Sequence, residues 1–203
     1  MLADTKEESG VTAAAGTTKA RIERAALALF CLRGVDAVTT REIAAASGVS
    51  EGALYRHYPS KEALSETMFF EIHARLAAEV AKAAASADDI EDKARAIVAA
   101  YARIADEDWT LFSYHLLTTH RFLPFAERPA PQGGVNLVAL VEEVVAEAMK
   151  NGDLPPGDAA MKASAALGVV LQTALHKIYG RVKGDLRSLE DALGRAVIAV
   201  LKS

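Results

Sequence analysis

Three side chains that could exchange or donate protons lie close together, namely Tyr55, His57 and Lys61 in the stretch "GVSEGALYRHYPSKEAL". One chemistry open to them is general acid–base catalysis on a bound substrate. A second is hydrogen bonding to the phosphates of a nucleic acid, for which the same groups are suitable donors. A third interpretation is packing around helix ends. The elements that carry these residues decide between the three.

The surrounding residues predict short helices with sharp ends. Thr39 and Glu42 have the spacing of a capping box, in which each side chain accepts from the other residue's backbone N–H. Gly48 breaks that first helix, and Ser50 can cap the next. Pro59 prevents the second helix from continuing, and Ser60 can begin a third.

Two short helices joined by a tight turn containing glycine form a helix-turn-helix, whose second helix can enter the major groove of DNA. A short exposed helix is a poor place to exclude water, which disfavours catalysis. The residue types suit DNA instead, because they are small enough for close approach or can donate to phosphates and base edges. The candidate DNA-contacting residues are Arg41, Ser50, Gly52, Ala53, Tyr55, Arg56, His57 and Lys61.

The remaining chain shows helical periodicity and no useful strand-like alternation, so we predict an all-α protein. All six prolines fall between periodic segments. Residues 1–16 are expected to form a disordered tail, 17–62 a helix-turn-helix DNA-binding domain, and 63–203 an effector-binding and dimerisation domain. The predicted helices span 17–33, 40–47, 51–58, 60–85, 88–106, 108–119, 133–151, 158–180 and 188–202.

Composition narrows the class of protein further. The net charge is −4, yet the segment 17–61 carries +3 and the rest −7, so a mildly basic quarter adjoins an acidic remainder. No apolar run reaches the ~18 residues of a membrane span, and no secretory signal is visible. Cys31 is the only cysteine, which excludes an intrachain disulfide and fits the cytoplasm. It is expected to be a small buried hydrophobe, with redox sensing as the alternative.

Neither a metal nor a cofactor is expected. His115 and His120 are five residues apart, and so they do not share a helix face as a metal-binding pair four apart would. No cluster of acidic residues accompanies them.

The segment "TTREIAAASGVSEGALYRHYPSKEAL" closely resembles the DNA-binding motif of the TetR family of transcriptional repressors, and the match extends over about residues 19–64. The resemblance implies a cytoplasmic homodimer that binds a palindromic DNA operator and is released by a small-molecule effector in the C-terminal bundle. It also adds Thr40 and Glu51 to the DNA-contacting residues. By position, Tyr55, His57 and Lys61 correspond to phosphate contacts. Arg41 and the stretch 51–53 correspond to base contacts.

Glu51 has two interpretations, because its charge is unusual at a DNA-facing position. It could accept from a cytosine amino group. It could instead stabilise its own helix from the first turn, which is the simpler explanation.

Aromatic and polar side chains gather between residues 109 and 125. They could be core packing, or they could line an apolar effector pocket with a few polar groups. The candidate pocket residues are Trp109, Phe112, His115 and Phe122, with Phe69 and His73 from the helix that follows the DNA-binding unit. Phe125 lies at the end of this region.

The last two predicted helices carry apolar and small residues on much of their surface, so they are either buried in the subunit or paired with a partner. The family resemblance implies a dimer interface here. Its candidate residues are Val169, Leu171, Leu175, Ile178, Leu193, Val197 and Val200.

The leading functional prediction is therefore a ligand-responsive repressor. A second is an activator or other DNA-binding regulator whose bundle binds a protein partner. A third is an enzyme or small-molecule carrier that does not use its helix-turn-helix.

Overall fold

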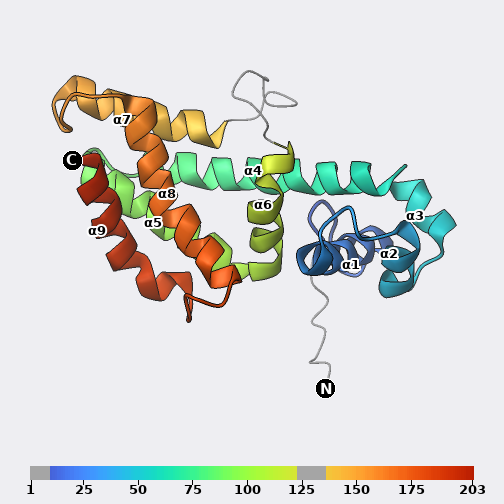
Figure 1. Cartoon of the computed structure of the whole chain (residues 1–203). Coiled ribbons are helices and arrows are strands. Elements are labelled where there is room, and N and C mark those ends of the chain that lie inside the picture. Colours follow the sequence, from blue (N-terminus) through green and yellow to red (C-terminus); the bar gives the residue numbers. More distant parts are fainter. Residues whose placement is uncertain (1–9, 123–135) are drawn as a thin grey trace. The chain divides into compact units, whose positions relative to one another are not determined.

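The chain is described here from a computed structural model, which covers residues 10–122 and 136–203. Within those residues every regular element is a helix, as the periodicity predicted. Figure 1 labels the α-helices in chain order. Their bounds are α1 Thr18–Arg33, α2 Thr40–Ser47, α3 Glu51–His57, α4 Lys61–Ala84, α5 Ile90–Glu107, α6 Trp109–Phe122, α7 Leu137–Asn151, α8 Ala159–Ile178, the short 3-10 helix η2 Leu186–Leu189 and α9 Glu190–Leu201.

The helices form two compact units, each with its own core. Of the described residues, the first comprises 10–72 and 110–122, and the second comprises 73–109 and 136–203. The long helix α4 contributes its first half to one unit and its second half to the other. This division differs from the expected boundary at residue 62, because α6 packs with the DNA-binding helices.

The first unit contains α1, α2, α3, the start of α4, and α6. Its core is built from fully buried aliphatic and aromatic side chains, including Ile22, Leu27, Ile43, Leu54 and Phe69. Three contacts bind α6 into it. The ring of Tyr114 stacks on Phe30 with centroids 6.0 Å apart, its hydroxyl lies 2.7 Å from Ser65 Oγ, and it donates to the Ser65 carbonyl at 2.6 Å. Burial raises the pKa of Tyr114 to about 12.

The tail expected over residues 1–16 is wrong for its described part. Val11 is buried, and Thr12 donates its backbone N–H to the Glu23 carboxylate at 2.9 Å. Thr12 Oγ1 and the Tyr58 hydroxyl donate to the same carboxylate. Residues 10–12 thus pack against the first unit, because the buried Glu23 carboxylate needs hydrogen-bond donors. Residues 1–9 lie outside the described part.

The second unit is a bundle in which α8 contacts both α7 and α9, and α5 contacts α9 and η2. Buried Val98, Val145, Val170 and Val197 belong to its core. Asp106 at the end of α5 accepts the backbone N–H groups of Leu186 and Arg187, which fixes the start of η2.

Candidate DNA-binding site

The helix α2 begins at the predicted capping box, which the structure confirms. Thr39 Oγ1 accepts the Glu42 N–H at 3.2 Å, and Glu42 accepts the Thr39 N–H at 2.8 Å. Arg33 donates to the same carboxylate at 2.9 Å. These hydrogen bonds, that from Arg33 first and those from Thr39 next, lower the pKa of Glu42 from 4.5 to about 2. The first turn of α2 is thereby fixed to the end of α1.

The turn between α2 and α3 requires glycine. Gly48 has φ +67° and ψ +35°, a left-handed conformation that costs a residue with a Cβ atom. Val49 then donates its N–H to Ala44 O at 3.0 Å, which ends α2. Ser50 caps α3 by accepting the Ala53 N–H at 3.1 Å, as predicted. Gly34, at the end of α1, also has a positive φ of +79°, but its ψ of 157° lies outside the αL region.

The predicted DNA-contacting residues lie at the start of α2, along α3 and at the start of α4. Arg41, Ser50, Glu51, Gly52, Arg56 and His57 are exposed, as is Tyr55 at 48%, while Thr40, Ala53 and Lys61 are half-buried. Tyr55 and His57 therefore face water, which suits anion binding rather than proton transfer to a bound substrate.

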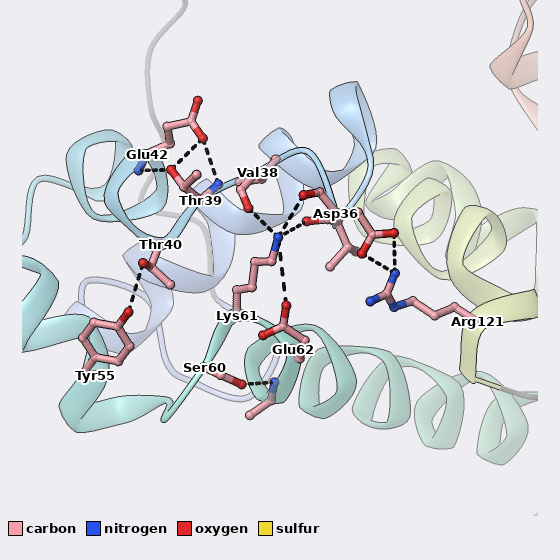
Figure 2. A network of polar contacts seen from close by, with 12 residues as sticks. Asp36, Val38, Thr39, Thr40, Glu42, Tyr55, Ser60, Lys61, Glu62 and Arg121 are labelled. Carbon is pink, nitrogen blue, oxygen red and sulfur yellow. Dashed lines mark hydrogen bonds and ion pairs between the residues drawn. The ribbon is translucent and has the colours of Figure 1, made fainter.

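Thr40, Tyr55 and Glu51 join α2 to α3 at this surface. The Thr40 hydroxyl lies 3.2 Å from the Tyr55 hydroxyl and donates to a Glu51 oxygen at 3.4 Å (Figure 2 shows the pair of hydroxyls). Glu51 also stands in the first turn of α3, where a negative charge is favourable. It is thus engaged within the DNA-free protein.

Lys61 stands apart from the other predicted contacts. Its ammonium group points into the loop between α1 and α2 and donates to the carbonyl oxygens of Val35, Asp36 and Val38 at 3.0, 3.0 and 2.8 Å (Figure 2). Ser60 caps α4 just before it by accepting the Ala63 N–H at 3.0 Å, as predicted.

The sequence reading missed Arg121, which reaches the same loop from the end of α6. Its Nη1 donates to both carboxylate oxygens of Asp36, at 2.8 and 2.9 Å (Figure 2). The two residues are 85 positions apart. No local pattern could have joined them, because their meeting depends on where α6 packs.

The predicted effector-pocket residues divide between the units. Phe69, Phe112, His115 and Phe122 belong to the first, where the Phe69 ring stacks on His115 at 4.8 Å and lies 5.0 Å from Phe122. His73 and Trp109 belong to the second. Burial lowers the pKa of His73. Lys177 Nζ lies 4.8 Å from the centre of the Trp109 ring. Phe125 lies outside the described residues.

A separate crevice of about 50 Å³ lies in the second unit, between α5, α7, α8 and α9. Its walls are entirely aliphatic, and Val98, Val141, Val145 and Val170 are among them. None of the six predicted pocket residues lines it.

Two residues of the predicted dimer interface are buried within the protomer. Leu193 and Val197 are each only 6% exposed on α9, a helix that packs on α5 and α8, which corrects their assignment to an interface. Val169, Leu171, Leu175, Ile178 and Val200 are half-buried. The fully exposed positions on these helices are different ones, among them Met161, Ala165, Gly168, Ala196 and Ala199.

Cys31 is half-buried rather than buried, and its Sγ lies 3.3 Å from the Thr110 carbonyl. No group of three or more His, Cys, Asp or Glu that could hold a metal ion occurs in the described residues. Across 10–122 and 136–203, none of the helices combines the length and hydrophobicity needed to cross a bilayer.

An exposed helix-turn-helix that carries cations on both of its helices is the kind of DNA-binding unit found in transcription factors. The fold and the site therefore place the chain in the class of proteins with such a unit. Comparison with known proteins agrees. Residues 22–68 match the sequence model of "Bacterial regulatory proteins, tetR family". The chain is 50% identical over 44 residues to the nucleoid occlusion factor SlmA of Pasteurella multocida, covering 22% of each chain.

Two longer matches extend beyond the motif. The chain is 29% identical over 159 residues to the HTH-type transcriptional regulator Mb2274c of Mycobacterium bovis, covering 77% of this chain and 79% of that one. The structure of the transcriptional regulator FadR from Bacillus subtilis in complex with stearoyl-CoA has the same fold. Its TM-score is 0.69 at 16% identity, over 89% of this chain and 97% of that one.

Over residues 22–68 the DNA-binding unit is thus of the kind found in the TetR family of bacterial regulatory proteins. The matched family and the two relatives of similar length are transcriptional regulators rather than enzymes.

Proposed function

We propose that the chain is a transcriptional repressor that binds a palindromic operator as a homodimer and is released by an apolar small molecule. One observation carries the proposal: α2 and α3 present Arg41, Tyr55, Arg56 and His57 outward from a rigid, capped helix-turn-helix. One such unit touches few bases, whereas two units about one helical turn (~34 Å) apart read both halves of a palindrome.

The aliphatic crevice of the second unit supports an apolar effector. Its walls contribute no charge or hydrogen-bonding group that would favour a polar ligand. The FadR relative of the same fold was solved with stearoyl-CoA, a long-chain acyl ligand. At about 50 Å³ the crevice has room for about one or two waters only, so an effector must bind a state in which it is wider. Such binding favours release if the wider state holds DNA less well.

The outer surfaces of α8 and α9 support the dimer. Small or apolar residues are exposed along them at Met161, Ala165, Gly168, Ala196 and Ala199. Exposed apolar side chains of this kind are one mark of a protein interface.

Fluorescence anisotropy on DNA from upstream of the protein's own gene, with a scrambled duplex as control, tests the proposal. We expect operator binding to be tighter by 10³-fold or more than binding to the scrambled duplex. Arg41→Ala should reduce that ratio, because a guanidinium that reads a base contributes to selectivity. Arg56→Gln should weaken binding to both duplexes and lower the slope of log K against log salt by ~0.9. Equal affinity of the wild-type protein for both duplexes would contradict a sequence-specific regulator.

The effector is tested by adding saturated fatty acids and acyl-CoAs of increasing chain length to the bound complex. Val141→Phe fills the crevice and should raise the concentration needed for release. Val138→Phe, on the same helix but 47% exposed, is the matched control. Identical release curves for all three proteins would remove the crevice from the mechanism.

A further inference from the structure

The ammonium group of Lys61 is enclosed by the loop that connects α1 to α2. It makes three hydrogen bonds, to the carbonyl oxygens of Val35, Asp36 and Val38, at 2.8–3.0 Å (Figure 2). A lysine ammonium has three N–H donors and no acceptor, so all of its donors are used. Its side chain is only 19% exposed, and a Glu62 carboxylate oxygen lies 4.0 Å from Nζ.

The three carbonyls belong to a segment that has little regular hydrogen bonding of its own. It begins after Gly34, where the chain leaves α1 with a positive φ, and ends at Thr39, the N-cap of α2. Within it, Val38 donates its N–H to the Val35 carbonyl at 3.4 Å. Backbone carbonyls that are partly buried need donors, and here the donors come from the first residue of α4.

The segment leads directly to residues that face DNA. Val38, whose carbonyl makes the shortest of the three bonds, is buried and is followed by Thr39, Thr40 and Arg41. A displacement of the Val38 carbonyl would therefore move the first turn of α2. It would also move Thr40 away from Tyr55, since their hydroxyls are only 3.2 Å apart.

We propose that Lys61 is a positioning residue, which holds the start of α2 in register for DNA reading, and that it is not a phosphate ligand. The inference rests on the proposed function, because it takes α2 and α3 to be the DNA-reading helices. Phosphate oxygens only accept hydrogen bonds, so a phosphate could bind Lys61 only by displacing one of the three carbonyls. Arg41, Arg56 and His57 have exposed side chains and can reach a phosphate without such a loss.

Two substitutions separate the alternatives. Lys61→Arg keeps the positive charge and would serve a phosphate as well as lysine does, but its planar fork cannot direct three donors onto three converging carbonyls. Lys61→Met removes the donors and keeps an apolar stem of similar length. Arg56→Gln, which alters an exposed cation on α3, shows what the loss of a charge contact does to the salt dependence.

We expect Lys61→Arg and Lys61→Met to behave alike. Both should lower the Tm of the DNA-free protein and reduce the operator-to-scrambled affinity ratio by at least tenfold, while the salt slope on scrambled DNA stays that of the wild type. If Lys61 were merely structural, the two substitutions would lower the Tm but leave the operator-to-scrambled affinity ratio of the folded protein unchanged. The proposal is overturned if Lys61→Arg matches the wild type throughout while Lys61→Met lowers the salt slope by ~0.9 on both duplexes.

A measurement on the unaltered protein covers the case in which the variants fail to fold. Reductive methylation followed by mass spectrometry reports how accessible each lysine amine is, with exposed Lys183 as the internal reference. We expect Lys61 to react at least tenfold more slowly than Lys183, both without DNA and with it. Lys61 reacting as fast as Lys183 in the free protein, and becoming protected on the operator, would show a phosphate contact instead. Failure of the proposed function is seen separately, as a lack of operator binding by the wild-type protein.

Discussion

Glu23 is a carboxylate with no exposed surface in the first unit. Thr12 donates to it through both its backbone N–H and its hydroxyl, and Tyr58 donates its phenol. Burial, reinforced by the Glu23 carboxylate, raises the pKa of Tyr58. Tyr58 is also the C-cap of α3, so this cluster holds the end of the DNA-reading helix from its inner side.

Thr12→Val tests the cluster at the scale of one residue. It removes one donor and leaves a buried carboxylate less well satisfied, so the free energy of unfolding should fall by about 1–3 kcal/mol. Denaturant titration measures the loss. Thr110→Val, at an exposed position, is the control and should change the free energy of unfolding by no more than ~0.5 kcal/mol. Equal small effects of the two substitutions would mean that the segment 10–16 does not contribute to stability.

Glu42 gives a prediction for the dependence of stability on pH. Its pKa is lowered from 4.5 to about 2 in the folded protein, by Arg33 first and Thr39 next, so the folded state favours the ionised form. The contribution to stability is therefore present above pH 4.5 and is lost as the pH falls from 4.5 towards 2. The Tm difference between the wild type and Glu42→Gln should be largest near neutral pH and should shrink across that interval. A difference that stays constant from pH 7 to pH 2.5 would contradict the assigned role of the charge.

At the scale of elements, the helix bounds follow from local signals, and the packing of the helices does not. The predicted 40–47 matches α2, and the predicted 51–58 and 60–85 differ from α3 and α4 by one residue at their ends. Caps act between residues two or three positions apart, so they can be read directly along the chain. The place of α6 in the first unit depends on Tyr114 meeting Ser65, a contact across 49 positions.

The end of α9 is held by a side chain from α8. Lys162 is 4% exposed and donates to the carbonyl of Leu201, the last residue of α9, at 3.0 Å, and to the main-chain oxygen of Ser203 at 2.6 Å. A cation there is favourable, because the last carbonyls of a helix lack intrahelical donors and carry partial negative charge.

Lys162→Met should therefore lower the free energy of unfolding by about 1–3 kcal/mol, since the carbonyls lose their donor in a buried place. Chemical denaturation monitored by circular dichroism checks this. Lys183→Met, in an exposed loop position, serves as the control and should be near neutral. A loss as small as that of the control would exclude a stabilising role for Lys162.

At the scale of the whole molecule, the proposed dimer can be tested by a substitution that should not unfold the protomer. A Cβ atom at Gly168 would meet nothing within 4 Å, and the residue is exposed on α8. Gly168→Glu should therefore keep the protomer folded, yet place a charge in the proposed interface and produce a monomer in sedimentation velocity at micromolar concentration. Operator affinity should fall with it, because two linked helix-turn-helix units are needed for a palindrome.

Ala146→Glu introduces the same side chain at an exposed position of α7, outside the proposed interface, and should leave the association state of the wild type unchanged. If Gly168→Glu remained dimeric, the dimer interface would have to lie elsewhere on the protomer. A monomeric wild-type protein would remove the dimer from the proposal altogether.

The sequence by itself determined the helix-turn-helix, because its signals are a capping box, a glycine turn, a serine cap and a proline stop within some twenty residues. Only the tertiary structure decided what Lys61, Glu23 and Arg121 do. Their partners lie 11 to 85 positions away along the chain, and such contacts arise from helix packing rather than from spacing along the chain. The same reason explains Leu193 and Val197, whose apolar character suited either an interface or a core until packing placed them in the core.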